Sequence, residues 1–146
     1  MNAHDRDNEV PMSTYTSSVN VVIRHPSRHV DEIATSLEWE PHGAWSVGED
    51  RVTPAGTVLP GIRQETMCSF RFERDDDQLT AALATTLKHL VSKRLFIKDL
   101  LASGGTLAIN IGLNGHVNSS LDLSPEQLQT ICELSIRLSV ECFPDG

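Results

Sequence analysis

Apolar and polar residues alternate along four separate segments of this chain, and this pattern restricts its possible folds more than any other feature. In residues 106–113, four aliphatic side chains occupy every second position, and only Ala, Asn and Gly lie between them. A period of two places such side chains on one face of a β-strand. The same period in residues 15–24, 67–73 and 138–142 predicts three further strands, each with one buried face.

Helical spacing separates these strands. Apolar residues in Val30–Leu37 recur at intervals of three and four, which predicts a two-turn helix that stops before Pro41. The same spacing predicts a long helix over residues 79–91 and a shorter segment over residues 96–101. A capping box predicts a last helix beginning after Ser124, with three residues directed inward: Leu128, Ile131 and Cys132.

Three aspartates precede the long helix, at positions 75, 76 and 77. Adjacent carboxylates can attract a hard cation, but calcium loops spread their ligands over alternating positions around a glycine turn. Aspartate is also strongly favoured at helix N-caps and in the first helical turn. We therefore expect the aspartates to cap the helix rather than to bind a metal.

The order of elements predicts an α+β fold with a single antiparallel or mixed sheet and helices mainly on one face. It forms two strand–helix–strand halves joined by the long helix. Residues 1–14 are polar and aperiodic, which is typical of a disordered tail, so residues 15–146 are expected to form one domain. Asn114-Gly115 is a turn dipeptide that allows a hairpin into residues 116–121.

Charge and composition exclude several classes of function. A net charge of −8 opposes general nucleic-acid binding, which needs clustered Lys and Arg, and favours basic protein partners or none. The chain lacks a signal-peptide core and any apolar run near the roughly 18 residues of a membrane span, so we expect a cytoplasmic protein. Its three cysteines form no Cys-x-x-Cys pair, which favours reduced, buried thiols.

No catalytic or cofactor signature is present. The histidines fit no zinc-ligand spacing, no serine lies in a Gly-x-Ser-x-Gly elbow, and the glycines lack the spacing of a phosphate-binding loop. The sequence therefore predicts no metal, no cofactor and no nameable nucleophile.

Residues 41–65 show no sustained period and contain several prolines and glycines. A loop of this length is more often functional than accidental in a compact domain, although residues 58–62 can form a short edge strand. Both tryptophans lie near its start. We expect Trp39 to pack on the core and to be more buried than Trp45, and we name three candidate binding residues: His42, Trp45 and Glu65.

The helix residues Ile33, Ala34 and Leu37, followed by Pro41 and Gly48, give the chain a family resemblance. Together with the later run 123–128, Leu-Ser-Pro-Glu-Gln-Leu, and a terminal strand, they resemble the bacterial family called domain of unknown function 4279. The resemblance covers roughly Val19 to Phe143 and implies a bacterial cytosolic domain with no established catalytic residues. Some relatives are similar to small immunity-type proteins that neutralise a partner.

Three hypotheses about function follow. The first is a non-enzymatic interaction module, of immunity type in one version, whose loop 41–65 meets a protein partner, with basic partners favoured by charge. The second is a small-ligand-binding protein or weak hydrolase that uses His42 and Glu65. The third is a structural or dimerising role through an exposed edge strand. The sequence is compatible with a monomer or a homodimer.

Overall fold

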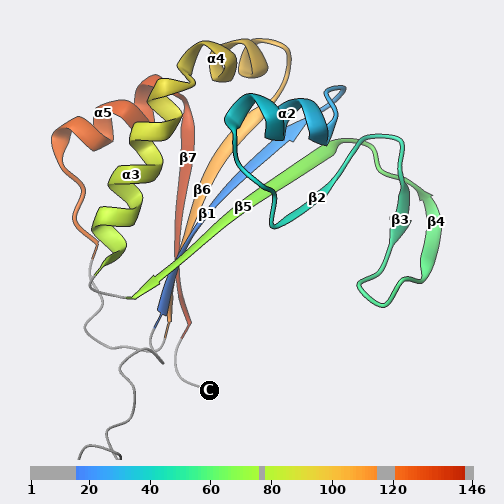
Figure 1. Ribbon diagram of the computed structural model, residues 1–146, viewed down its shortest axis with the longest axis horizontal. Coiled ribbons are helices and arrows are strands. Elements are labelled where there is room, and N and C mark those ends of the chain that lie inside the picture. Colours follow the sequence, from blue (N-terminus) through green and yellow to red (C-terminus); the bar gives the residue numbers. More distant parts are fainter. Residues whose placement is uncertain (1–15, 76–77, 115–120, 144–146) are drawn as a thin grey trace, which may run out of the picture.

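The computed structural model describes residues 16–75, 78–114 and 121–143. The predicted tail 1–14 and most of the predicted hairpin strand 116–121 lie outside these residues. Within these residues, four helices and seven strands form an α+β fold (Figure 1). The strands are β1 Thr16–His25, β2 Gly43–Trp45, β3 Asp50–Val52, β4 Val58–Ile62, β5 Thr66–Asp75, β6 Thr106–Asn114 and β7 Ile136–Phe143, and the helices are α2 Val30–Leu37, α3 Leu79–Ser92, α4 Arg94–Ala102 and α5 Pro125–Glu133.

The main sheet has five strands in the order β2-β5-β1-β6-β7, and β3 and β4 form a separate hairpin. The central strand β1 is antiparallel to both neighbours, whereas β6 and β7 are parallel. The sheet is therefore mixed. The two strand–helix–strand halves differ in the direction of their strands. In the first half, β1 and β5 are antiparallel; in the second half, α5 connects β6 to β7, which is parallel to it. Two consecutive helices, α3 and α4, join them.

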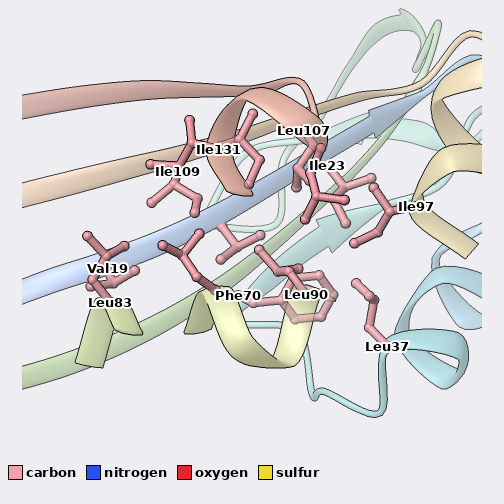
Figure 2. Packing of buried hydrophobic residues seen from close by; sticks show 14 of the residues in the cluster. Val19, Ile23, Leu37, Phe70, Leu83, Leu90, Ile97, Leu107, Ile109 and Ile131 are labelled. Atoms are coloured by element: carbon pink, nitrogen blue, oxygen red, sulfur yellow. The ribbon is translucent and has the colours of Figure 1, made fainter. Parts of the chain in front are cut away.

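One face of the sheet carries the hydrophobic core. Val19, Val21 and Ile23 of β1 are at most 1% exposed and face the helices, as does the buried row of β6. Figure 2 shows Val19, Ile23, Phe70 and Ile109 against side chains from α3, α4 and α5. Trp39 also packs on this core, with its ring 5.5 Å from that of Phe70. The predicted apolar faces of these strands are confirmed.

The opposite face of the sheet is largely polar. On β1 it carries Ser18, Asn20 and Arg24, because alternate side chains point to opposite faces. The strand register places Arg24 beside Met67 of β5, and Met67 beside Trp45 of β2. Trp45 and Arg24 therefore share the polar face, although β5 lies between their strands.

Several predictions about local structure were wrong. Residues 41–65 are not one irregular loop, since they contain β2 and β3 in addition to β4, which is the short strand predicted at residues 58–62. Asp75 ends β5, and the N-cap of α3 is Gln78, which makes no side-chain capping bond. Positions 76 and 77 lie outside the described residues. Leu79, the first residue of α3, is buried in the core.

Burial near the C-terminus also differs from the prediction. The capping box at Ser124 is present as predicted, and Ile131 is buried. Leu128, however, is 47% exposed, and Cys132 is exposed as well. Of the three cysteines, all free, only Cys68 is buried. α5 packs against α3 and β7, and this packing buries Ile131 but leaves Leu128 and Cys132 exposed.

Candidate functional site

The β3–β4 hairpin is fixed to the main sheet at its base. Gly48 N–H donates to the carbonyl of Arg63 over 2.9 Å, and Arg63 N–H donates to the carbonyl of Glu49 over 2.8 Å. Just beyond, the buried hydroxyl of Thr66 donates to the carbonyl of Arg28 over 2.5 Å and accepts from Val47 N–H over 2.9 Å. These bonds hold the segment after Trp45 against the start of β5.

A second polar contact links this segment to α2. Ser46 Oγ accepts a hydrogen bond of 3.0 Å from Val30 N–H, one of the four amides at a helix start that lack intrahelical partners. The N-cap residue His29 makes no side-chain capping bond itself. The helix is thus capped from a residue far along the chain, so α2 and β2 are positioned together.

Trp45 and Arg63 form the centre of the site. The indole N–H of Trp45 donates to the carbonyl of Glu65 over 3.1 Å, which fixes the ring on the polar face of the sheet. The guanidinium carbon of Arg63 lies 3.9 Å from the centre of the Trp45 ring. This distance is within the range of a cation–π contact. The arginine side chain therefore has a defined position instead of extending into solvent.

A pocket of about 410 Å³ opens beside this stacked pair. Its side walls come from β1, β2 and the hairpin, and it is lined by three arginines, one carboxylate, the indole and an exposed isoleucine: Arg24, Arg51, Arg63, Glu65, Trp45 and Ile62. Gly61 and Gln64 complete the lining. Three cations against one carboxylate make this pocket locally positive in a chain whose net charge is −8.

The three arginines of the pocket differ in the groups that their side chains contact. Arg24 pairs with Glu65, with 2.8 Å between its guanidinium nitrogen and the carboxylate oxygen. Arg51 donates to the carbonyl of Pro60 over 3.2 Å. Arg63 has its Nε buried without a hydrogen-bond partner among the described residues. Within the described chain, neither Arg51 nor Arg63 forms an ion pair, so two cations remain available to an anion.

The structure brings together two of the three candidate binding residues. Trp45 and Glu65 both line the pocket. His42 is exposed, and its backbone N–H pairs with Ser69 at the edge of the sheet, outside the pocket lining. Sequence reasoning missed Arg24, Arg51 and Arg63. They lie on three different strands or turns, so no local spacing could have revealed the cluster.

A histidine–serine pair lies elsewhere, between the end of β1 and the end of α4. Nε2 of His25 is 2.9 Å from Ser103 Oγ, and Nδ1 accepts from the backbone N–H groups of Ser27 and Arg28 over 3.0 and 2.9 Å. Because Nδ1 accepts, Nε2 carries the proton and donates to the serine. The imidazole therefore has no free lone pair toward Ser103 and cannot act as its general base.

Burial, with the nearby charge of Arg28 second, lowers the pKa of His25 below its usual 6.5. The neutral ring is thus the form that fits this position. His25 is 1% exposed, so its role is to connect β1, the turn before α2 and the end of α4.

Among the described residues, no three His, Cys, Asp or Glu side chains converge as metal ligands. None of the described helices is long and apolar enough to cross a membrane. No protein-family model, curated protein or solved structure matches this chain. The site must therefore be interpreted from its own chemistry.

Proposed function

We propose that this protein is a non-enzymatic interaction module whose arginine pocket receives a carboxylate group of a protein partner. The observation that carries the proposal is Arg63, which is held on the face of Trp45, lines the pocket and forms no ion pair in the described chain. A guanidinium offers donors in a planar fork that matches a carboxylate. Arg51 adds a second unpaired cation at the same opening.

The surroundings favour a macromolecular partner over a small ligand. The pocket lies on the open polar face of the sheet, and Ile62 at its rim is 50% exposed. Small-molecule sites usually enclose most of the ligand surface and are lined mainly by apolar side chains. A pocket with an aromatic, an arginine cluster and an exposed apolar rim has the composition of a protein-interface hot spot.

Net charge and local charge act differently on such a partner. The overall charge of −8 favours basic proteins at a distance, which supports the expectation of a basic partner. At contact, the pocket itself favours an acidic group. A partner with a basic surface and one protruding Asp or Glu satisfies both conditions.

The alternative, a weak hydrolase using His42 and Glu65, has less support. His42 is outside the pocket, and Glu65 is engaged by Arg24. The lining residues include no Ser, Cys or His that could supply a nucleophile and its base. The resemblance to domain of unknown function 4279, with its immunity-type relatives and cytosolic setting, is compatible with the interaction role and stays a prediction.

The test uses an acidic peptide as the probe. A hexaglutamate peptide should quench the emission of Trp45, while a hexaglutamine peptide should not, and inorganic phosphate provides a third arm. Arg63→Gln should weaken hexaglutamate binding about tenfold, the loss expected for one charged hydrogen-bonded contact. Arg71→Gln is the matched control, because Arg71 lies on the same sheet face, outside the pocket, and pairs with Glu73.

Equal binding of the glutamate and glutamine peptides would contradict the proposal, as would unchanged affinity in Arg63→Gln. Tighter binding of phosphate than of hexaglutamate would assign the pocket to a phosphorylated ligand instead.

A further inference from the structure

The two edges of the main sheet differ in length and in protection. The β2 edge is three residues long and continues into the β3–β4 hairpin. The β7 edge is eight residues long, and β6 is the one described strand that pairs with it. Its outer side therefore presents backbone N–H and C=O groups that can pair with another strand.

Apolar residues are exposed on the same part of the molecule. Val140 of β7 is 47% exposed, although its parallel neighbour Ile111 is fully covered. Leu128 of α5, the helix that leads into β7 and packs against it, is also 47% exposed. Cys132, one turn after Leu128, and Cys142 are exposed as well. The sequence pattern predicts these residues to be inward, but the single chain leaves them uncovered.

We propose that β7 pairs in an antiparallel manner with β7 of a second copy of this chain, centred on Ser139, to form a continuous ten-strand sheet. A two-fold axis makes such a contact self-complementary. It covers the outer edge of β7 and places a second strand beside Val140. This dimer edge is separate from the arginine pocket, which lies toward the β2 side.

Charge selects the register. Side chains on a strand alternate between the two faces of the sheet. The helices of both copies therefore lie on the same face of the joint sheet only when the two-fold axis passes through a residue that pairs with its own copy, and not between two residues. Centring on Ser139 places Arg137 opposite Glu141 of the second copy, twice by symmetry, and Leu138 opposite Val140. Centring on Arg137 or Glu141 opposes like charges. Centring on Leu138 or Val140 leaves Arg137 opposite an uncharged residue.

Charged residues on an edge strand usually discourage pairing. Here Arg137 and Glu141 are both exposed, lie on the same face and have opposite signs at equal distances from Ser139. These charges therefore disfavour pairing with most other strands, but in a pair of two β7 strands each arginine meets a glutamate. The same two residues give the edge its specificity for self-pairing.

The first test is charge reversal, read by sedimentation equilibrium. The natural chain should be a dimer, and Arg137→Glu or Glu141→Arg should each weaken dimerisation about tenfold, because like charges then oppose each other twice. The double variant Arg137→Glu/Glu141→Arg should restore it. Arg71→Glu, on the same face but away from the edge, should leave it unchanged. A natural chain that stays monomeric to millimolar concentration, or a double variant as weak as the singles, would overturn the proposal.

The second test is cross-linking in a Cys132→Ser/Cys142→Ser background. Ser139→Cys should form an intersubunit disulfide on oxidation, since the two copies of position 139 face each other at the axis. Arg137→Cys should not, because four residues of strand, about 13 Å, separate its copies. Cross-linking of Arg137→Cys in place of Ser139→Cys would show a different register and overturn the one proposed.

Discussion

The guanidinium of Arg63 lies 3.9 Å from the ring centre of Trp45, while the indole N–H of the same tryptophan is bonded to the carbonyl of Glu65. One aromatic ring thus connects β2, the base of the hairpin and the start of β5. The pocket depends on this contact because it fixes an arginine that has no carboxylate partner in the described chain.

Removing Arg63 should expose the Trp45 ring. In a Trp39→Phe background, Arg63→Ala should increase acrylamide quenching of Trp45 and lower the free energy of unfolding by about 0.5–2 kcal/mol, the range of a cation–π contact. Arg51→Ala is the control, since Arg51 lines the pocket but is bonded to Pro60 rather than stacked on the ring. Equal quenching in both variants would argue against the stacked geometry.

Replacing the hydroxyl of Thr66 should destabilise the protein more than its size suggests. Thr66→Val keeps the shape of this fully buried side chain but leaves the Arg28 carbonyl and the Val47 N–H without their partner. We expect a loss of about 2 kcal/mol in urea unfolding, the cost of unsatisfied buried polar groups. Thr85→Val, at an exposed hydroxyl on α3, should cost less than about 0.5 kcal/mol. Similar losses at both positions would contradict this interpretation.

Stability should fall in mild acid because of His25. Its pKa is lowered in the folded state, so the unfolded chain binds this proton more readily. The neutral ring of His25 makes its full contribution to stability above pH 6.5, the pKa of histidine in the unfolded chain. This contribution decreases as the pH falls from 6.5 through the lower pKa of the folded state. Urea unfolding across pH 7.5 to 5 should show this loss, and His25→Gln should reduce it.

His42→Gln serves as the control for removing one histidine, because His42 is exposed at the sheet edge. It should retain the acid-sensitive profile of the natural chain. If His25→Gln shows the same decrease as the natural chain, the acid sensitivity arises from another group.

Gly105 should not tolerate a side chain. A Cβ there would lie 2.5 Å from a methyl carbon of Leu100 and 2.8 Å from its carbonyl oxygen, at the tight connection between α4 and β6. Gly105→Ala should cost about 1–3 kcal/mol, as overpacking of a core does. Gly43→Ala in β2 has nothing within 4 Å of the new carbon and should change the free energy of unfolding little. Thermal or urea unfolding of both variants provides the measurement.

Local patterns in the sequence correctly predicted the elements that have a buried face. Val30–Leu37 was predicted with its observed bounds, and the alternation in residues 106–113 matches the buried row of β6. Short-range spacing is sufficient there, because one side of each element meets the core. Of the β3–β4 hairpin, the sequence indicated only the short strand at residues 58–62, which is β4. β3 and the pairing of the two strands were missed because all of β3 and nearly all of β4 are exposed, so backbone pairing defines them without an apolar period.

The candidate site likewise combines residues that the local sequence indicated with residues that only the tertiary structure brings together. Composition and the irregular segment 41–65 led to the prediction of His42, Trp45 and Glu65 as binding residues; Trp45 and Glu65 line the pocket, and His42 lies outside it. The pocket arginines could not be found from sequence, because the tertiary structure brings Arg24 of β1, Arg51 of β3 and Arg63 together from distant parts of the chain.

The sequence alone determined the α+β class, the helix and strand periods and the capping box of α5, all of which depend on neighbours a few residues apart. Tertiary structure decided what depends on distant pairing: the parallel β6–β7 ladder, the cap of α2 by Ser46, and the positive pocket in a negative chain. Net charge is a sum over the whole molecule, whereas a binding site depends on which few charges the fold places side by side.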